Sequence, residues 1–297
     1  MKIFYADQYP LTLPEGHIYP AEKYVRLRFE LLAQGVIQKE QLFKAHPAEM
    51  DQILLAHSKE YYDEICSGRI NTRKLRVLGL PWSEALIEHA HLSVGGVIAA
   101  AREALQSGIA GALSGGTHHA FYDEGRGFCI FNDAAVVILD LFKKQAIRRA
   151  AVIDVDTHQG NGTASIFNHN KDVFILDIYG SSNYPVRKVT ASLNIPLPTG
   201  TQDDEYLDAL SRSLPSVFSF NPDIIFYIGG VDPLGSDRFN KLALSIQGLQ
   251  ERDKMVFEEC RNHHVPVVLT MGGGYSKVDV TVQAHVNTYK MASIVYH

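Results

Sequence analysis

The stretch Ala151-Val-Ile-Asp-Val-Asp-Thr-His-Gln-Gly-Asn-Gly162 decides how this chain folds and what chemistry it carries. It begins as an apolar run typical of a β-strand and ends on Asp154, Asp156 and His158, spaced two residues apart. In an extended chain successive side chains alternate between faces, so these three project from one side. Buried charges are costly unless they are paired or bind metal. The stretch therefore predicts a strand that leads into a metal site.

Short apolar runs rich in β-branched residues alternate with helical patterns along the chain. Near-continuous apolar runs such as Val173–Ile178 indicate strands that are buried on both faces. Alternation with helices predicts a single α/β domain over residues 1–297, with a mostly parallel central sheet flanked by helices. The predicted strands are Lys2–Tyr5, Gly111–Leu113, Ala150–Val155, Val173–Ile178, Ile224–Ile228 and Val265–Met271; the predicted helices are Glu84–Leu105, Ala134–Lys144, Asp204–Phe218 and Leu242–His263.

Four of the predicted strands are followed by polar, mostly glycine-containing segments. In parallel α/β sheets ligands bind beyond the carboxyl ends of the strands, so these segments are expected to converge on one rim. Glycine allows close backbone approach beside such a site. The segments are 115–119, 156–158, 229–232 and 271–275.

Three side chains on this rim have the chemistry of metal ligands. Asp156, His158 and Asp232 can bind one divalent ion and leave positions open for water and substrate, as catalytic zinc requires. Mixed oxygen and nitrogen ligands also suit iron, cobalt or manganese. A second ion would need further carboxylates, and the Asp232 loop offers only Asp237. One catalytic metal is therefore expected.

The same rim carries two consecutive histidines and a tyrosine. One of His118 and His119 can act as general base on a water while the other polarises or protonates the reacting group. Tyr275, which follows three glycines, can donate its hydroxyl to a developing oxyanion. Together with a metal, these groups indicate hydrolysis of an amide or ester.

Composition limits the partners. The net charge of −5 gives no electrostatic case for nucleic acid or an anionic membrane. The three cysteines are an odd, widely spaced set, which favours a reducing compartment, and the lack of a CxxC pair excludes a zinc ribbon or a thioredoxin-type site. Neither a signal peptide nor an apolar membrane span is evident, so we expect a soluble, cytoplasmic protein. Ten of the 13 histidines, all except His118, His119 and His158, are assigned no functional role.

Taken together, the ordered motifs resemble the zinc-dependent histone deacetylase family. The likeness extends from about Tyr5 to Tyr275. The motifs are His57-Ser-Lys-Glu-Tyr-Tyr62, Gly115-Gly-Thr-His-His-Ala120, Gly127-Phe-Cys-Ile-Phe-Asn-Asp133, Asp154-Val-Asp-Thr-His158, Gly230-Val-Asp232 and Gly273-Gly-Tyr275.

The resemblance implies an arginase-like α/β fold and removal of acyl groups from lysine or a related amine. It implies one zinc ion on the three ligands named above, with iron or cobalt as alternatives. It further implies His119 as general base, His118 as its partner and Tyr275 as transition-state donor. Phe128, with Gly127, would line a narrow channel for the acyl-lysine.

Two positions depart from the common family pattern. Asn161 replaces the usual Asp partner of the base histidine, and the segment His158–Gly162 is similar to the class IV branch. A carboxylate partner raises a histidine pKa, whereas a neutral amide does not. We therefore expect His119 to stay neutral to lower pH than in a relative with Asp. Asp177 stands where many relatives have Ser, and by similarity it would bind structural potassium with Asp154.

The amino-terminal motif of the family is also altered, to Gly16-His-Ile-Tyr-Pro-Ala-Glu-Lys-Tyr24. Within it Lys23 is the candidate for lining an acetate exit. Substrate preference is expected to depend on rim loops around Tyr5–Lys23, Arg69–Trp82 and Ser181–Lys188, which carry no known motif.

Several alternatives stay open at this stage. The substrate can be an acylated lysine in a protein or peptide, an acetylated polyamine or another small amide, and histones are not assumed. The class IV likeness adds long fatty acyl groups to the candidates. An arginase-type ureohydrolase would need two metals, and a non-catalytic acyl-lysine-binding protein would need no turnover. We expect a monomer.

Overall fold

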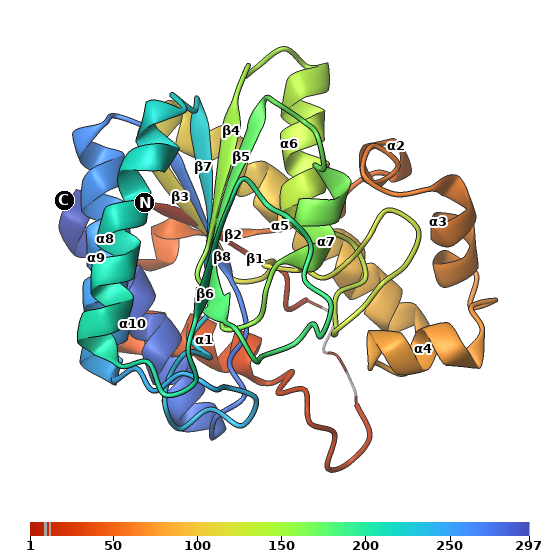
Figure 1. The fold of residues 1–297 in the computed structure, drawn as a ribbon. Coiled ribbons are helices and arrows are strands. Elements are labelled where there is room, and N and C mark those ends of the chain that lie inside the picture. The colour runs from red at the N-terminus through yellow and green to blue at the C-terminus, as the bar shows by residue number, and fades with distance from the viewer. Residues whose placement is uncertain (9–10, 12, 297) are drawn as a thin grey trace.

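An eight-stranded sheet, parallel throughout, runs through the middle of the molecule (Figure 1). The computed structural model describes residues 1–8, 11 and 13–296, so three residues of the Tyr5–Lys23 loop and His297 lie outside it. The strand order is β2-β1-β3-β8-β7-β4-β5-β6. The strands are β1 Lys2–Tyr5, β2 Leu42–Lys44, β3 Ile109–Ala112, β4 Ala150–Asp154, β5 Val173–Gly180, β6 Leu193–Leu197, β7 Ile224–Gly229 and β8 Val267–Met271.

Helices cover both faces of the sheet, with α1, α8, α9 and α10 on one side and α5, α6 and α7 on the other (Figure 1). Within the described ranges, none of the helices combines the length and apolar character that crossing a membrane requires. The helices are α1 Lys23–Ala33, α2 Met50–Ile53, α3 Lys59–Cys66, α4 Thr72–Leu78, α5 Glu84–Ser107, α6 Asp133–Lys143, α7 Asn161–Ile166, α8 Asp203–Ser219, α9 Ile246–Asn262 and α10 Val278–Tyr296, with a 3-10 turn at Lys39–Gln41.

Strand β4 illustrates why the central strands are largely apolar. Ala150 and Val152 pack into the core beneath α5 and α6, whereas Ala151 and Ile153 pack into the core beneath α8, α9 and α10. Each residue of the strand is buried. Because a period of two sends neighbours to opposite faces and both faces are covered, the run contains no solvent-facing position.

The predicted elements are confirmed with shifts at some boundaries. The strand predicted at Gly111–Leu113 is Ile109–Ala112, because pairing with β8 begins at Ile109. The helix predicted from Leu242 begins at Ile246, where Ser245 caps it by accepting a hydrogen bond from the backbone of Gly248 at 3.0 Å. Strand β4 ends at Asp154, so the extended spacing predicted through His158 is wrong beyond that residue.

Several elements had not been predicted from the sequence. Strands β2 and β6 are short edge strands, and β6 contains Pro196, which is tolerated at an edge. Helices α1 to α4, α7 and α10 were also missed. In α10 apolar and polar residues are mixed around the helix, so the pattern of one buried face is weak.

Candidate metal centre and active site

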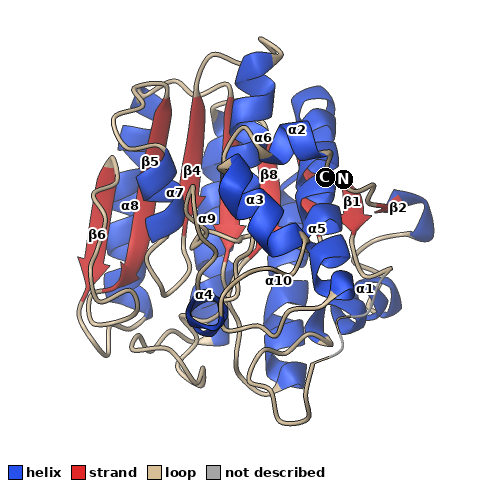
Figure 2. Cartoon of the chain, turned by 90° about the vertical axis from the view of Figure 1, so that its right-hand side faces the viewer, coloured by secondary structure: helices blue, strands red, loops and turns tan. Residues whose placement is uncertain are grey.

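The order of the strands brings the four polar segments together. Strands β3, β8, β7 and β4 are consecutive neighbours in the sheet, and each is followed by one of those segments. In Figure 2 the strands point toward the edge where the long loops gather. The predicted convergence at the carboxyl ends of the strands is confirmed.

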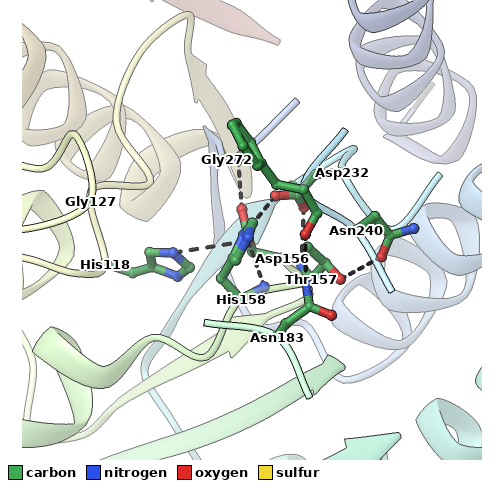
Figure 3. A network of polar contacts seen from close by, with 12 residues as sticks. His118, Gly127, Asp156, Thr157, His158, Asn183, Asp232, Asn240 and Gly272 are labelled. Carbon is green, nitrogen blue, oxygen red and sulfur yellow. Dashed lines mark hydrogen bonds and ion pairs between the residues drawn. The ribbon is translucent and has the colours of Figure 1, made fainter. Parts of the chain in front are cut away.

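One group of ligand atoms meets the requirements of a metal site within the described residues. The ligand atoms of Asp156, His158 and Asp232 all lie within 4.8 Å of one another. Nδ1 of His158 is 2.9 Å from Oδ1 of Asp156 and 3.1 Å from Oδ2 of Asp232. Figure 3 shows His158 between the two carboxylates. Two buried carboxylates and an imidazole form a donor set that suits a divalent cation.

The backbone of neighbouring loops holds these carboxylates. The Gly273 amide donates to Oδ2 of Asp156 at 2.6 Å, and the Thr157 amide donates to Oδ1 of Asp232 at 2.9 Å. Burial and the adjacent Asp156 charge raise the pKa of Asp232 to about 7. Burial would lower the pKa of His158, but its hydrogen bonds to both carboxylates raise it to about 10. The two carboxylates are thus held close together in a buried position, where a bound cation would stabilise their charged forms.

The two consecutive histidines have different partners. Nδ1 of His118 lies 2.6 Å from Oδ2 of Asp154, and Nδ1 of His119 lies 2.8 Å from Oδ1 of Asn161. Burial would lower the pKa of His118, but the charges of Asp154 and Asp156 raise it to about 9. Burial and the neighbouring cations of His118 and His158 hold the pKa of His119 well below its usual range. His118 therefore favours the imidazolium, and His119 favours the neutral imidazole.

Tyr275 lies next to His158, in the wall of a cavity that leads to the metal-ligand group. Its backbone amide donates to Oδ2 of Asp237 at 2.6 Å, and its ring centroid lies 5.9 Å from that of Phe128 and 6.4 Å from that of His158. Burial and the charges of Asp156 and Asp232 raise the pKa of the phenol well above its usual range. Its hydroxyl therefore remains a hydrogen-bond donor.

A cavity of about 330 Å³ leads from the surface to this group and has Gly127 and Phe128 in its wall. Gly127 has φ +52°, and a Cβ there would lie 2.7 Å from Cδ2 of His119. Glycine is therefore required where the chain passes the imidazole. Phe128 itself adopts φ +67°, which is unusual for a bulky residue. This wall is where the family resemblance implies a channel for the acyl-lysine, which stays a prediction.

Asp154 and Asp177 are cross-strand neighbours in the pairing of β4 with β5. Oδ2 of Asp177 accepts a hydrogen bond from the Gly160 amide at 2.9 Å, whereas its Oδ1 is buried without a hydrogen-bond partner in the described structure. Burial and the neighbouring Asp154 raise the pKa of Asp177 well above its usual range. An unpartnered carboxylate oxygen beside a second carboxylate fits the predicted monovalent cation, which stays a prediction.

Lys23 lies at the inner end of the site. It is 1% exposed, and its Nζ donates to the Gly272 carbonyl at 3.2 Å. Its Nζ is 5.6 Å from the ring centroid of Tyr275. Burial lowers the pKa of Lys23 to about 8, against the opposing effect of Asp232 and Asp156. A small inner cavity has Lys23, Tyr24, His118, Cys129 and Tyr275 among its lining residues.

Sequence reasoning missed two supporting residues, Asn240 and Arg252. Oδ1 of Asn240 accepts a hydrogen bond from the Thr157 hydroxyl at 2.7 Å. Arg252 is fully buried in α9 and donates to backbone carbonyls beside the metal-ligand loops. The spacing of Leu249, Arg252 and Val256 puts an arginine on the apolar face of a helix, and that signal could have identified it.

Residues 17–290 match the family model of the histone deacetylase domain, and the chain belongs to that family. A protein of Picosynechococcus sp., named only as uncharacterized, is 36% identical over 99% of both chains. Histone deacetylase 2 of Arabidopsis thaliana is 29% identical over 96% of this chain and 77% of its own. The histone deacetylase-like amidohydrolase of Pseudomonas aeruginosa is 28% identical over 93% of this chain and 79% of its own.

Solved structures agree with this assignment. An HDAC homolog complexed with SAHA superposes with a TM-score of 0.84 at 26% identity, covering 99% of this chain and 84% of that chain. An HDAC homolog from Aquifex aeolicus superposes with a TM-score of 0.82 at 25% identity, covering 98% and 83%. The predicted fold class is confirmed.

Proposed function

We propose that this member of the histone deacetylase family is a metal-dependent deacylase. It hydrolyses the amide between an acyl group and the amine of a lysine side chain or a related amine. The observation that carries the proposal is a buried three-ligand group beside an outer and an inner cavity, which His119 and Tyr275 both line and to whose inner part His118 contributes. The names of the relatives, deacetylase and amidohydrolase, support the same reaction class.

Asp156, His158 and Asp232 are the residues that would hold one zinc ion, or iron or cobalt in its place. A bound ion would supply Lewis-acid polarisation of the amide carbonyl and of the attacking water. The donor set supports one ion per chain. Among the described residues, Asp237 does not belong to the group of ligand atoms that lie within 4.8 Å of one another. This argues against the two-metal ureohydrolase.

The side chains of the protein then divide the proton transfers. Neutral His119, whose Nδ1 is engaged with Asn161, takes a proton from the attacking water through its other nitrogen. The Tyr275 hydroxyl donates a hydrogen bond to the developing oxyanion. The imidazolium of His118, held by Asp154, supports the charge of the intermediate and supplies a proton toward the leaving amine. A protein that only binds acyl-lysine would need none of these groups.

The cavity mouth favours lysine over a polyamine as the carrier. Ile18, Val77 and Tyr184 line it, one from each of the three predicted rim loops. Lys241 also lines it, and the described lining residues include no carboxylate. An acetylated polyamine carries additional ammonium groups, which Lys241 would repel at the exposed rim by up to about 1 kcal/mol. An acyl-lysine in a peptide avoids this repulsion.

The finer assignments belong to the same proposal. Asn161 within His158–Gly162 supports affiliation with the class IV branch, and with it removal of acyl chains longer than acetyl. Asp154 and Asp177 are the proposed potassium ligands, supported by the unpartnered oxygen of Asp177. We also propose a monomer, and the net charge of −5 supports a protein that needs neither nucleic acid nor an anionic membrane.

A panel of acyl-lysine peptides and acetylated polyamines, with acyl chains from acetyl to myristoyl, tests the proposal. We expect peptide hydrolysis that a chelator abolishes and added Zn²⁺ restores, with acetylated polyamines turned over more slowly. Charge reversal at the mouth, Lys241→Glu, should narrow that difference, whereas Lys290→Glu on α10, away from the cavity lining, should not. Tight binding of acyl-lysine without turnover by the zinc-loaded protein would overturn the proposal in favour of the binding reading.

A further inference from the structure

A buried ion pair lies behind the candidate metal site and has no part in the chemistry described so far. Arg252 and Asp253 in α9 are 0% and 1% exposed. Nε of Arg252 donates to Oδ1 of Asp253 at 2.9 Å, and its Nη2 lies 2.7 Å from the same oxygen. Hydroxyls of Tyr227 and Thr288 donate to the Asp253 carboxylate. The guanidinium is thus fixed in orientation on one side.

The other side of the guanidinium contacts the two chain segments that carry the acidic metal ligands. Nη1 of Arg252 donates to the Gly230 carbonyl at 2.8 Å and to the Val155 carbonyl at 3.2 Å. Val155 immediately precedes Asp156, and Gly230 precedes Asp232 by two residues. One nitrogen therefore joins the β4 loop to the β7 loop.

These contacts occur where the sheet no longer holds the loops together. The last paired residues of β4 and β7 are Asp154 and Ile228, so strand pairing stops short of both ligands. Beyond that point the loops approach closely, since a Cβ on Gly230 would lie 2.7 Å from Cα of Asp156. Gly230 is thus in contact with Asp156 and bonded to Arg252.

We propose that Arg252 is a positioning residue that sets the separation between the carboxylates of Asp156 and Asp232. The inference rests on the proposed metal site and adds a residue that contacts neither the ion nor the substrate. A planar guanidinium presents donors along separate fixed directions, so it can bind Asp253 and two carbonyls at once. A lysine ammonium keeps the charge but cannot reproduce this geometry. Outer-shell partners of metal ligands typically contribute 10- to 100-fold to affinity.

The test compares Zn²⁺ affinities, measured by competition with a chromogenic chelator, for the wild-type protein and the Arg252→Lys variant. We expect Arg252→Lys to weaken Zn²⁺ binding roughly tenfold or more. The visible absorption of the Co²⁺-loaded protein should change as well, because it reports ligand geometry. Arg261→Lys is the matched control, since Arg261 lies on the same helix and donates to the Val295 carbonyl, away from the site. This control should bind Zn²⁺ as the wild type does.

The outcomes separate this inference from the proposed function. If the wild-type protein binds no Zn²⁺, or if the Asp156→Asn variant binds Zn²⁺ as tightly as the wild type, the assignment of the metal site is wrong. If the wild type binds through Asp156 but folded Arg252→Lys retains wild-type affinity and an unchanged Co²⁺ spectrum, the positioning role is overturned. Should Arg252→Lys fail to fold, Arg252→Met combined with Asp253→Leu removes the pair without leaving an unpaired charge. The folded double variant is then held to the same affinity criterion.

Discussion

His118 and His119 occupy adjacent positions in the site, but their imidazoles favour opposite protonation states. Their ring centroids lie 4.1 Å apart, and both side chains are buried. Burial lowers the pKa of each, but Asp154 beside His118 reverses the effect, whereas Asn161 beside His119 does not. One carboxylate against one amide therefore separates a stored proton from a proton acceptor. The role of each histidine depends on its partner, not on the histidine itself.

The largest expected effect on activity comes from removing His119, the neutral histidine. His119→Ala should lower kcat/KM by about 10²- to 10⁴-fold, because the base that accepts the proton of water is lost. His118→Ala should lower it less, since the imidazolium is not the acceptor. Steady-state kinetics on an acyl-lysine peptide, with metal content measured for each variant, checks this. If both variants lose kcat/KM equally at full metal occupancy, the two histidines do not have the different roles assigned to them.

A third buried histidine, His57, has only neutral backbone partners among the described residues and lies away from the carboxylates of the site, so it shows the effect of burial on a histidine pKa. His57 lies 2.9 Å from both the Phe121 carbonyl and the Asn132 amide, and burial lowers its pKa to about 4. Its folded-state pKa lies below the unfolded value of about 6.5, so its contribution is complete above pH 6.5 and lost as pH falls toward 4. The fall should amount to about 3 kcal/mol for this group.

Denaturant unfolding of the wild-type protein and His57→Gln between pH 7.5 and pH 4 measures this term. We expect the variant to be less stable at pH 7.5 but to lose less stability on acidification. Parallel curves for the two proteins over that range would contradict the assignment.

Removing the carboxylate partner of His118 should have an intermediate effect on activity. Asp154→Asn gives both histidines amide partners, so the pKa of His118 should fall and the stored proton should be lost at neutral pH. We expect kcat to fall by roughly 100-fold, at the lower end of what a general acid–base group contributes. Kinetics at low and high K⁺ distinguish this from loss of a cation ligand. Full rescue by K⁺ would assign Asp154 to the cation alone.

Replacing the amide partner of His119 by a carboxylate should have the smallest effect on activity. Asn161→Asp puts a carboxylate 2.8 Å from Nδ1 of His119 if the side chain keeps its place. An opposite charge at this distance raises a histidine pKa by about one unit or more, so the acidic limb of the pH–rate profile should move to higher pH. Activity at alkaline pH should change little. An acidic limb that stays in place would show that Asn161 does not set the protonation of His119.

Much of the site was predictable because its residues lie in short local patterns. Apolar runs identified the central strands, and the residues after them supplied Asp156, His158, Asp232 and Tyr275. Boundaries and edge elements were less accessible, because β2 and β6 have few residues and their pairing depends on distant partners. Helical spacing could have marked Arg252 as an arginine on an apolar face, but the carbonyls that it reaches could not be predicted, because no spacing encodes those contacts.

The sequence by itself determined the α/β class and the chemistry of the candidate ligands. Those features depend on side-chain type and on periods of two or about four residues, which local sequence records. Only the tertiary structure decided that β3, β8, β7 and β4 are neighbours, that Lys23 is buried at the inner end of the site, and that Arg252 joins two loops. These are long-range contacts, set by packing of the whole core, and local periodicity contains no information about them.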